Sequence, residues 1–367
     1  MSEPITSAPG VRTAFLSWST LLPVVACVLL GVSSQVSGPV VLAAVVLVLV
    51  GTVLAAVHHA EVIALRVGEP FGTLVLALCV TLIEVALIVS MMLASGAKGA
   101  AIARDTVYAT IMLVLTGIVG LSLLVGGLRH REQEFHLEGV SAALATLAAV
   151  AVLTLIFPVY TTSRPGPWYT DDQLLLIAAA SLVLYATFVF TQTVRHRGYF
   201  LDRVGSEQVP STTPPSNSDV LLSSVLLVVA LAAVILLTKT LAPSLEVALD
   251  RAGAPPGVKG VLIAALVLMP EGLSAVLAAR ANRLQTSLNL ALGSALASIG
   301  LTIPVVGVLA VTTGMPLELG IDGRSSALLL LSLFVTSLAL STGRTIVLHG
   351  VVLLVVLAVY VYTTFVP

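Results

Sequence analysis

The chain has 367 residues, of which 58% are hydrophobic and only 10% are charged, and its mean hydropathy is +1.10. This composition excludes a water-soluble domain of ordinary kind, because runs of roughly 20 apolar residues recur along the chain and each could cross a bilayer as a helix. The formal net charge of −1 gives no sign of a nucleic-acid or polyanion partner. Cys27 and Cys79 lie inside apolar segments, where we interpret them as small core residues and not as a disulfide or metal pair.

The apolar segments predict an all-α, polytopic membrane protein with about eleven transmembrane helices. The expected spans are residues 13–32, 38–57, 71–95, 100–127, 139–160, 172–192, 219–241, 257–280, 286–312, 324–341 and 345–366. With the N-terminus inside, the inner segments carry ten Lys and Arg residues and the outer segments carry six. The excess of positive charge predicts a cytoplasmic N-terminus and an external C-terminus in the cell inner membrane.

Residues 195–218 form the longest polar stretch, and their Pro, Ser and Thr content predicts a flexible cytoplasmic linker. The linker follows six spans and precedes five, so one extra helix and two five-helix repeats would account for the chain. The predicted parts are residues 1–37 (tail and extra first helix), 38–194 (first repeat), 195–218 (linker) and 219–367 (second repeat). Because five is an odd number, the two repeats would cross the membrane in opposite directions, and such inverted repeats place transport sites near the midplane.

Two glutamates occupy matching places in these repeats. Glu84 and Glu271 each lie about midway along an apolar span, five spans apart. A charge at that depth costs at least ~2.5–3.5 kcal/mol on insertion scales, so such residues usually belong to an ion or proton pathway. We therefore predict that the two carboxylates meet between the repeats and bind a cation.

Hydroxyl residues would complete the oxygen ligands that a cation such as Ca²⁺ requires. Two segments that follow the glutamates align without a gap, Asp105–Ile111 with Gly293–Ile299, and the alignment pairs Thr110 with Ser298. The further candidate ligands share these helices: Thr81, Asp105, Thr106, Ser294 and the backbone carbonyl of Leu266, four residues before Pro270. A proline inside a helix frees that carbonyl and kinks the axis.

The same carboxylates can carry protons when the cation leaves. A cation-loaded pair and a proton-loaded pair are both close to neutral, whereas a bare pair of charges is costly at this depth. Competition between metal ions and protons for one site would therefore give exchange by alternating access, without a cofactor or a catalytic group. Ca²⁺ and protons are the expected substrates, the lipid bilayer is the expected surrounding, and no nucleic-acid partner is expected.

These segments resemble the calcium/cation antiporter superfamily, and most of all the bacterial calcium/proton antiporters of its cation/proton exchanger branch. The resembling stretches are EPFGTLVLALCVTLIEVALI, RDTVYATIMLVLTG and VLMPEGLSAVLAARANRLQTSLNLALGSALASIGLTIP. The resemblance implies that one glutamate on each repeat binds the cation and exchanges it for protons, which by position are Glu84 and Glu271. Many family members have Asn three residues before the glutamate, where this chain has Thr81 and Leu268. Two carboxamide ligands are therefore missing, and a Na⁺/H⁺ or K⁺/H⁺ antiporter on the same scaffold is the alternative.

Other functional classes fit the sequence less well. An intramembrane serine protease would need a nucleophile motif such as G-x-S-x-G, which the chain lacks, and no H-E-x-x-H metalloprotease motif occurs. A channel would need a weak multi-site path, whereas two buried carboxylates in inverted repeats favour alternating access. Asp105 has a second interpretation, because it could form an ion pair with its neighbour Arg104 near the outer surface.

Overall fold

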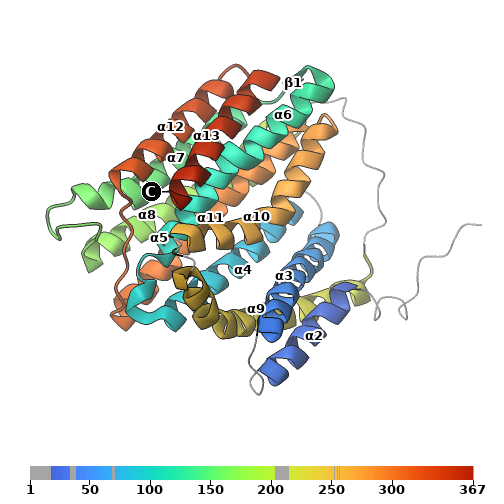
Figure 1. Cartoon of the computed structure of the whole chain (residues 1–367). Helices are drawn as coiled ribbons and strands as arrows, with labels where there is room; N and C mark the ends of the chain where they lie inside the picture. Colours follow the sequence, from blue (N-terminus) through green and yellow to red (C-terminus); the bar gives the residue numbers. More distant parts are fainter. Residues whose placement is uncertain are drawn as a thin grey trace, which may run out of the picture. The chain divides into compact units, whose positions relative to one another are not determined.

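The computed structural model describes residues 18–33, 39–67, 71–202, 215–251, 253, 255 and 257–366. Within these residues the chain is almost entirely helical, with one pair of short strands (Figure 1). The predicted N-terminal tail and residues 203–214 of the predicted linker, half of its length, lie outside the described residues. The chain divides into two compact units, residues 1–76 with 214–244 and residues 77–213 with 245–367.

The first unit contains helix α2 (Trp18–Ser33), helix α3 (Pro39–Val67) and the first part of helix α9 (Asn217–Arg251). His59 on α3 connects these three helices, because its ring bonds the Ser223 hydroxyl at 3.3 Å and lies 3.1 Å from the carbonyl oxygen of Ser19. Helix α4 (Phe71–Ser95) begins at the end of this unit and runs into the second one.

The second unit carries the remaining helices. In chain order they are η1 (Gly96–Gly99), α5 (Ile102–Met112), η2 (Leu113–Ile118), α6 (Val119–His130), α7 (Leu137–Ala151), η3 (Val152–Ile156), η4 (Phe157–Tyr160), α8 (Asp171–Phe190), η5 (Thr191–Arg195), η6 (Arg197–Phe200), α10 (Gly257–Arg280), α11 (Leu284–Thr313), α12 (Gly323–Ala339) and α13 (Val347–Phe365). Strands β1 (Glu132–Glu134) and β2 (Arg344–Ile346) pair antiparallel with Gln133 opposite Thr345.

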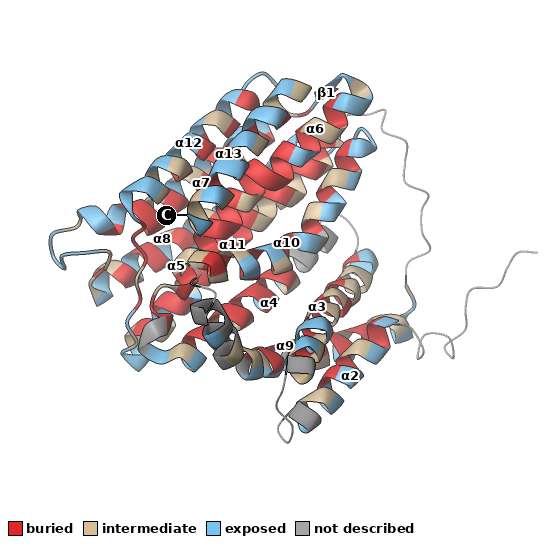
Figure 2. Ribbon diagram, viewed as in Figure 1, coloured by how far each residue is buried: buried red, intermediate tan, exposed pale blue. Residues whose placement is uncertain are grey.

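Helices α5 and α11 form the centre of the second unit. In the most apolar 18 residues of the α5–η2–α6 segment, 72% of the residues are buried, and the corresponding share in α11 is 61%. In the segments that contain α8 and α13, the share is only 28% and 22%. Figure 2 shows the same contrast, with buried residues along α11 and exposed residues on the outer sides of α12 and α13. Exposed large apolar side chains such as Val355 and Leu176 suit a lipid-facing surface.

The all-α, polytopic class predicted from the sequence is confirmed. Each of the eleven predicted spans coincides with an apolar helix in the described residues, but only eight of these helices are long enough alone to cross a membrane. One more, α10, is bent by 53° between Gly257–Met269 and Glu271–Arg280, and two others, Trp18–Gly31 and Gly323–Ala339, are shorter. The count of eleven therefore stays a prediction, as does the division into two five-helix repeats.

Two glycines allow close backbone approach between helices of the second unit. An added Cβ on Gly260 of α10 would lie only 2.5 Å from the backbone carbon of Asp105 on α5. On the far side of the core, a Cβ on Gly300 of α11 would lie 2.7 Å from the Cβ of Tyr185 on α8. Glycine at these two positions lets α10 and α8 pack directly against the central pair, a device common between membrane helices.

Candidate functional site

Glu84 is fully enclosed in the second unit. Its side chain is 3% exposed, and it lies within the span Leu78–Ser95 of α4. The apolar sequence on either side keeps this segment helical and buried, so the carboxylate depends on polar groups from other helices. A buried charge without such partners would be strongly unfavourable.

Two hydroxyls from different helices supply these partners. Ser298 on α11 donates a hydrogen bond to Oε1 of Glu84 at 2.7 Å, and Thr110 on α5 donates to the same oxygen at 3.2 Å. Both donors are 1% exposed. These are the two residues that the internal alignment pairs, so matched positions of the two halves of the chain contact one carboxylate oxygen.

Glu271 lies on α10, directly after the bend of that helix. Its side chain is 8% exposed. The helix is bent by 53° between Gly257–Met269 and Glu271–Arg280, where the sequence predicts a kink. Helix α10 packs against both α5 and α11, so the helix of the second glutamate contacts the two helices whose hydroxyls hold the first.

The remaining predicted ligands occupy different surroundings. Thr81 and Thr106 are buried, and Ser294 is partly buried on α11, one helical turn before Ser298. Leu266 lies in the first part of α10, four residues before the proline. Asp105 forms an ion pair with Arg104 at 2.8 Å at the start of α5, which is the second of the two interpretations given above.

A wide helical turn lies next to the site. After α5, the segment η2 takes a π-helical form, and the amide of Val119 donates to the carbonyl of Val114, five residues back. Turns of this kind are rare and often lie at functional sites. Here the turn begins three residues after Thr110, in the helix that contacts Glu84.

The hydroxyls can serve both states of an exchanging site. A hydroxyl has one donor and two lone pairs, so Ser298 and Thr110 can donate to a charged carboxylate and can turn a lone pair toward a cation. Among the described residues there is no group of three or more His, Cys, Asp or Glu side chains that could hold a metal ion. A cation at Glu84 would therefore need hydroxyl or carbonyl oxygens as well as carboxylates.

Sequence reasoning missed a polar cluster around strand β1 and the first turn of α11. Gln133 of β1 is 2% exposed and donates to the carbonyl of Ala279 at 2.9 Å and to the side chain of Asn282 at 3.0 Å. Nearby, Asp202 accepts bonds from the amide and the hydroxyl of Thr286 in the first turn of α11. These contacts connect loops distant in sequence, and only an isolated Gln inside a charged loop hinted at them.

Comparison with known proteins points to one family. A family model described as "Sodium/calcium exchanger protein" matches residues 37–194 and 222–366. The chain is 46% identical to y4hA of Sinorhizobium fredii over 363 residues, which cover 97% of this chain and 98% of y4hA. It is 38% identical to the sodium-potassium/proton antiporter ChaA of Escherichia coli over 363 residues, covering 97% and 98% of the two chains. It is 25% identical to the Ca²⁺/H⁺ antiporter of Aphanothece halophytica over 309 residues, covering 80% and 81%.

Solved structures have the same fold. The Ca²⁺/H⁺ antiporter protein YfkE aligns with a TM-score of 0.72 at 16% identity, over 96% of this chain and 100% of that one. The H⁺/Ca²⁺ exchanger CAX aligns with a TM-score of 0.70 at 15% identity, over 96% of this chain and 88% of that one. At such low identity the likeness shows a shared fold and leaves the transported ion open.

Proposed function

Because the chain belongs to the sodium/calcium exchanger protein family, we propose that it exchanges metal cations for protons across the membrane by alternating access. Glu84 and Glu271 are the proposed carriers, each holding either part of a cation's charge or a proton. The observation that carries this proposal is the enclosure of Glu84 by hydroxyls from α5 and α11, since a carboxylate kept at this depth serves ion or proton movement.

The exchange follows from charge balance at the site. A pair of carboxylates neutralises one divalent cation or holds two protons, and both loaded forms avoid an uncompensated charge in the membrane. If two protons leave for each divalent cation, the cycle is electroneutral. A pH difference of one unit is worth ~1.4 kcal/mol per proton, so two protons could support roughly a hundredfold cation gradient.

Two cation classes are candidates. Two carboxylates match the charge of Ca²⁺, and the sequence relative from Aphanothece halophytica is named a Ca²⁺/H⁺ antiporter. The hydroxyl ligands and the absence of Asn at positions 81 and 268 favour Na⁺ or K⁺, as does 38% identity to a sodium-potassium/proton antiporter. Ca²⁺ takes carboxylate, backbone carbonyl and carboxamide oxygens as ligands, so a shell completed by hydroxyls favours a less strongly charged ion.

The test uses everted membrane vesicles with a preset pH gradient and a fluorescent pH indicator. Addition of Ca²⁺, Na⁺ or K⁺ in turn should dissipate the gradient for the transported ions. Glu84→Gln and Glu271→Gln should each abolish the response, while Glu138→Gln, at an exposed position, should leave it unchanged. Substantial exchange in either buried variant would refute the proposed site, and the order of the three cations would decide between the two classes.

A further inference from the structure

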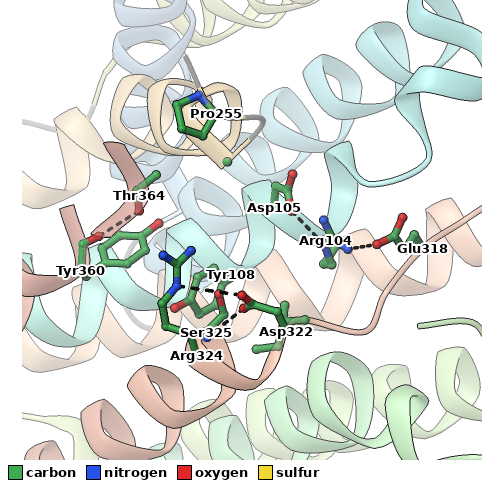
Figure 3. Close-up of a pocket in the computed structure, with 12 residues that line it drawn as sticks. Arg104, Asp105, Tyr108, Pro255, Glu318, Asp322, Arg324, Ser325, Tyr360 and Thr364 are labelled. Carbon is green, nitrogen blue, oxygen red and sulfur yellow. Dashed lines mark hydrogen bonds and ion pairs between the residues drawn. The ribbon is translucent and has the colours of Figure 1, made fainter. Parts of the chain in front are cut away.

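An ionic cavity lies at the start of α5, apart from the glutamate site. It has a volume of about 440 Å³, and Figure 3 shows the side chains that line it. Three carboxylates and two guanidinium groups line it: Asp105, Glu318, Asp322, Arg104 and Arg324. We refer to these five residues as the ionic vestibule. Its two arginines belong to segments that the charge count assigns to the outside.

Arg104 holds two parts of the chain together in this vestibule. Its Nε donates to Asp105 at 2.8 Å, and its Nη1 donates to the carboxylate of Glu318 and, at 3.1 Å, to the carbonyl of Gly320. The amide of Glu318 also donates to the carbonyl of Ala100 at 2.9 Å. These bonds tie the beginning of α5 to the segment that follows α11. The side chains of Arg104, Asp105 and Glu318 are 18%, 15% and 25% exposed, so water screens the pairs only partly.

Polar groups continue from the vestibule toward Glu84. On α5, Thr106 lies between Asp105 and Thr110, and on α11, Thr302 lies one turn beyond Ser298 on the way to the segment that carries Glu318. Both threonines are 0% exposed, and within the described part of the chain neither hydroxyl has a hydrogen-bond partner. A buried hydroxyl without a partner destabilises the fold unless a bound ion or molecule uses it as a ligand. At 1.5 Å per residue, the step from Asp105 to Thr110 is only about 7.5 Å along the helix.

We propose that Arg104 is a tethered cation that closes this route to Glu84. The guanidinium group binds Asp105 and Glu318, the carboxylates that an entering ion would otherwise meet. It also joins the beginning of α5 to the segment that follows α11, and these two parts must separate to admit the ion. A transported cation that takes the place of the guanidinium group at these carboxylates would open the route. The inference rests on the proposed exchange function and extends it to the control of entry.

Arg324 provides the contrast inside the same cavity. Its side chain is 43% exposed, and its ion pair is with Asp322, two residues away in sequence, at 3.9 Å. This pair connects no separate elements, and exposed pairs of this kind contribute little. Removal of Arg324 therefore changes the vestibule charge by the same amount as removal of Arg104, without breaking the connection between α5 and the segment after α11.

The experiment measures access to the route by thiol labelling. The parent carries Cys27→Ser, Cys79→Ala and the reporter Thr302→Cys, and a membrane-impermeant thiol reagent is added to right-side-out vesicles. Arg104→Gln should raise the labelling rate about tenfold or more, as expected for the loss of charged hydrogen bonds. Glu318→Gln, which breaks the same connection from the other side, should also raise it, and Arg324→Gln should leave it at the parent rate.

Each outcome decides the matter. Unchanged labelling in both Arg104→Gln and Glu318→Gln, or an equal rise in Arg324→Gln, would overturn the proposal. If Arg104→Gln does not reach the membrane, Glu318→Gln alone carries the test. Labelling needs no transport, so a chain that exchanges cations with unaltered labelling would reject the gate alone. A chain that labels as expected but does not exchange cations would reject the proposed function alone.

Discussion

The hydrogen bond from Ser298 to Glu84 gives a quantitative prediction for cation affinity. Ser298→Ala removes a donor 2.7 Å from the carboxylate, and a hydrogen bond to a charged group contributes about 1.5–3 kcal/mol. The ionised carboxylate of the cation-loaded site loses this stabilisation, whereas the protonated carboxylate of the proton-loaded site loses less. The apparent affinity for the transported cation should therefore fall roughly 10- to 150-fold.

The weaker contact at Thr110 sets an order between variants. Thr110→Val removes a bond of 3.2 Å and should reduce the apparent affinity less than Ser298→Ala does. Both donors share one carboxylate oxygen, so the effects in the double variant should not add.

The assay is cation-dependent proton movement in everted vesicles, measured over a range of cation concentrations. Ser181→Ala is the matched control, because this buried serine donates only to the carbonyl of Ile177 in its own helix, at 2.8 Å. An affinity for Ser298→Ala within twofold of the Ser181→Ala value would refute the role given to this hydroxyl.

Three further predictions concern the packing around the site. Gly260→Leu should abolish exchange, because the side chain would collide with the backbone of Asp105; normal exchange rates in vesicles would contradict this close approach. Asp202→Ala should lower the thermal unfolding temperature of the detergent-solubilised protein, since loss of a cap at Thr286 costs about 1 kcal/mol, and an unchanged temperature would count against this cap. Gln133→Leu should lower the unfolding temperature further, because the carbonyl of Ala279 at the end of α10 loses its buried donor. A smaller decrease than that of Asp202→Ala would contradict this order.

Local sequence features predicted the parts of the structure that local physics determines. Apolar runs of helical length located the helices, because backbone groups in lipid must be bonded within the segment. Pro270 located the bend of α10, because its missing amide and its ring act within one turn. The same reasoning placed two carboxylates on buried spans, where the structure has them at 3% and 8% exposure.

Contacts between distant segments had no such signature. Arg104 and Glu318 are 214 residues apart, and nothing in either neighbourhood indicates the other. The pairing of β1 with β2 is similar, since a strand of three residues, Glu132–Glu134, is too short and too charged to be recognised alone. The Arg104–Glu318 ion pair and the β1–β2 pairing form only because helix packing brings the ends of distant helices together.

The internal alignment lies between these two cases, because it is a sequence observation with a spatial consequence. Aligning Asp105–Ile111 with Gly293–Ile299 pairs Thr110 with Ser298, and both donate to Oε1 of Glu84. Two helices that merely resembled each other would have no reason to direct the same position at one atom. Helices related by a two-fold axis through the site would bring equivalent positions to it from opposite sides. The meeting of Thr110 and Ser298 at Glu84 is therefore the strongest support for a site built between two inverted halves of the chain.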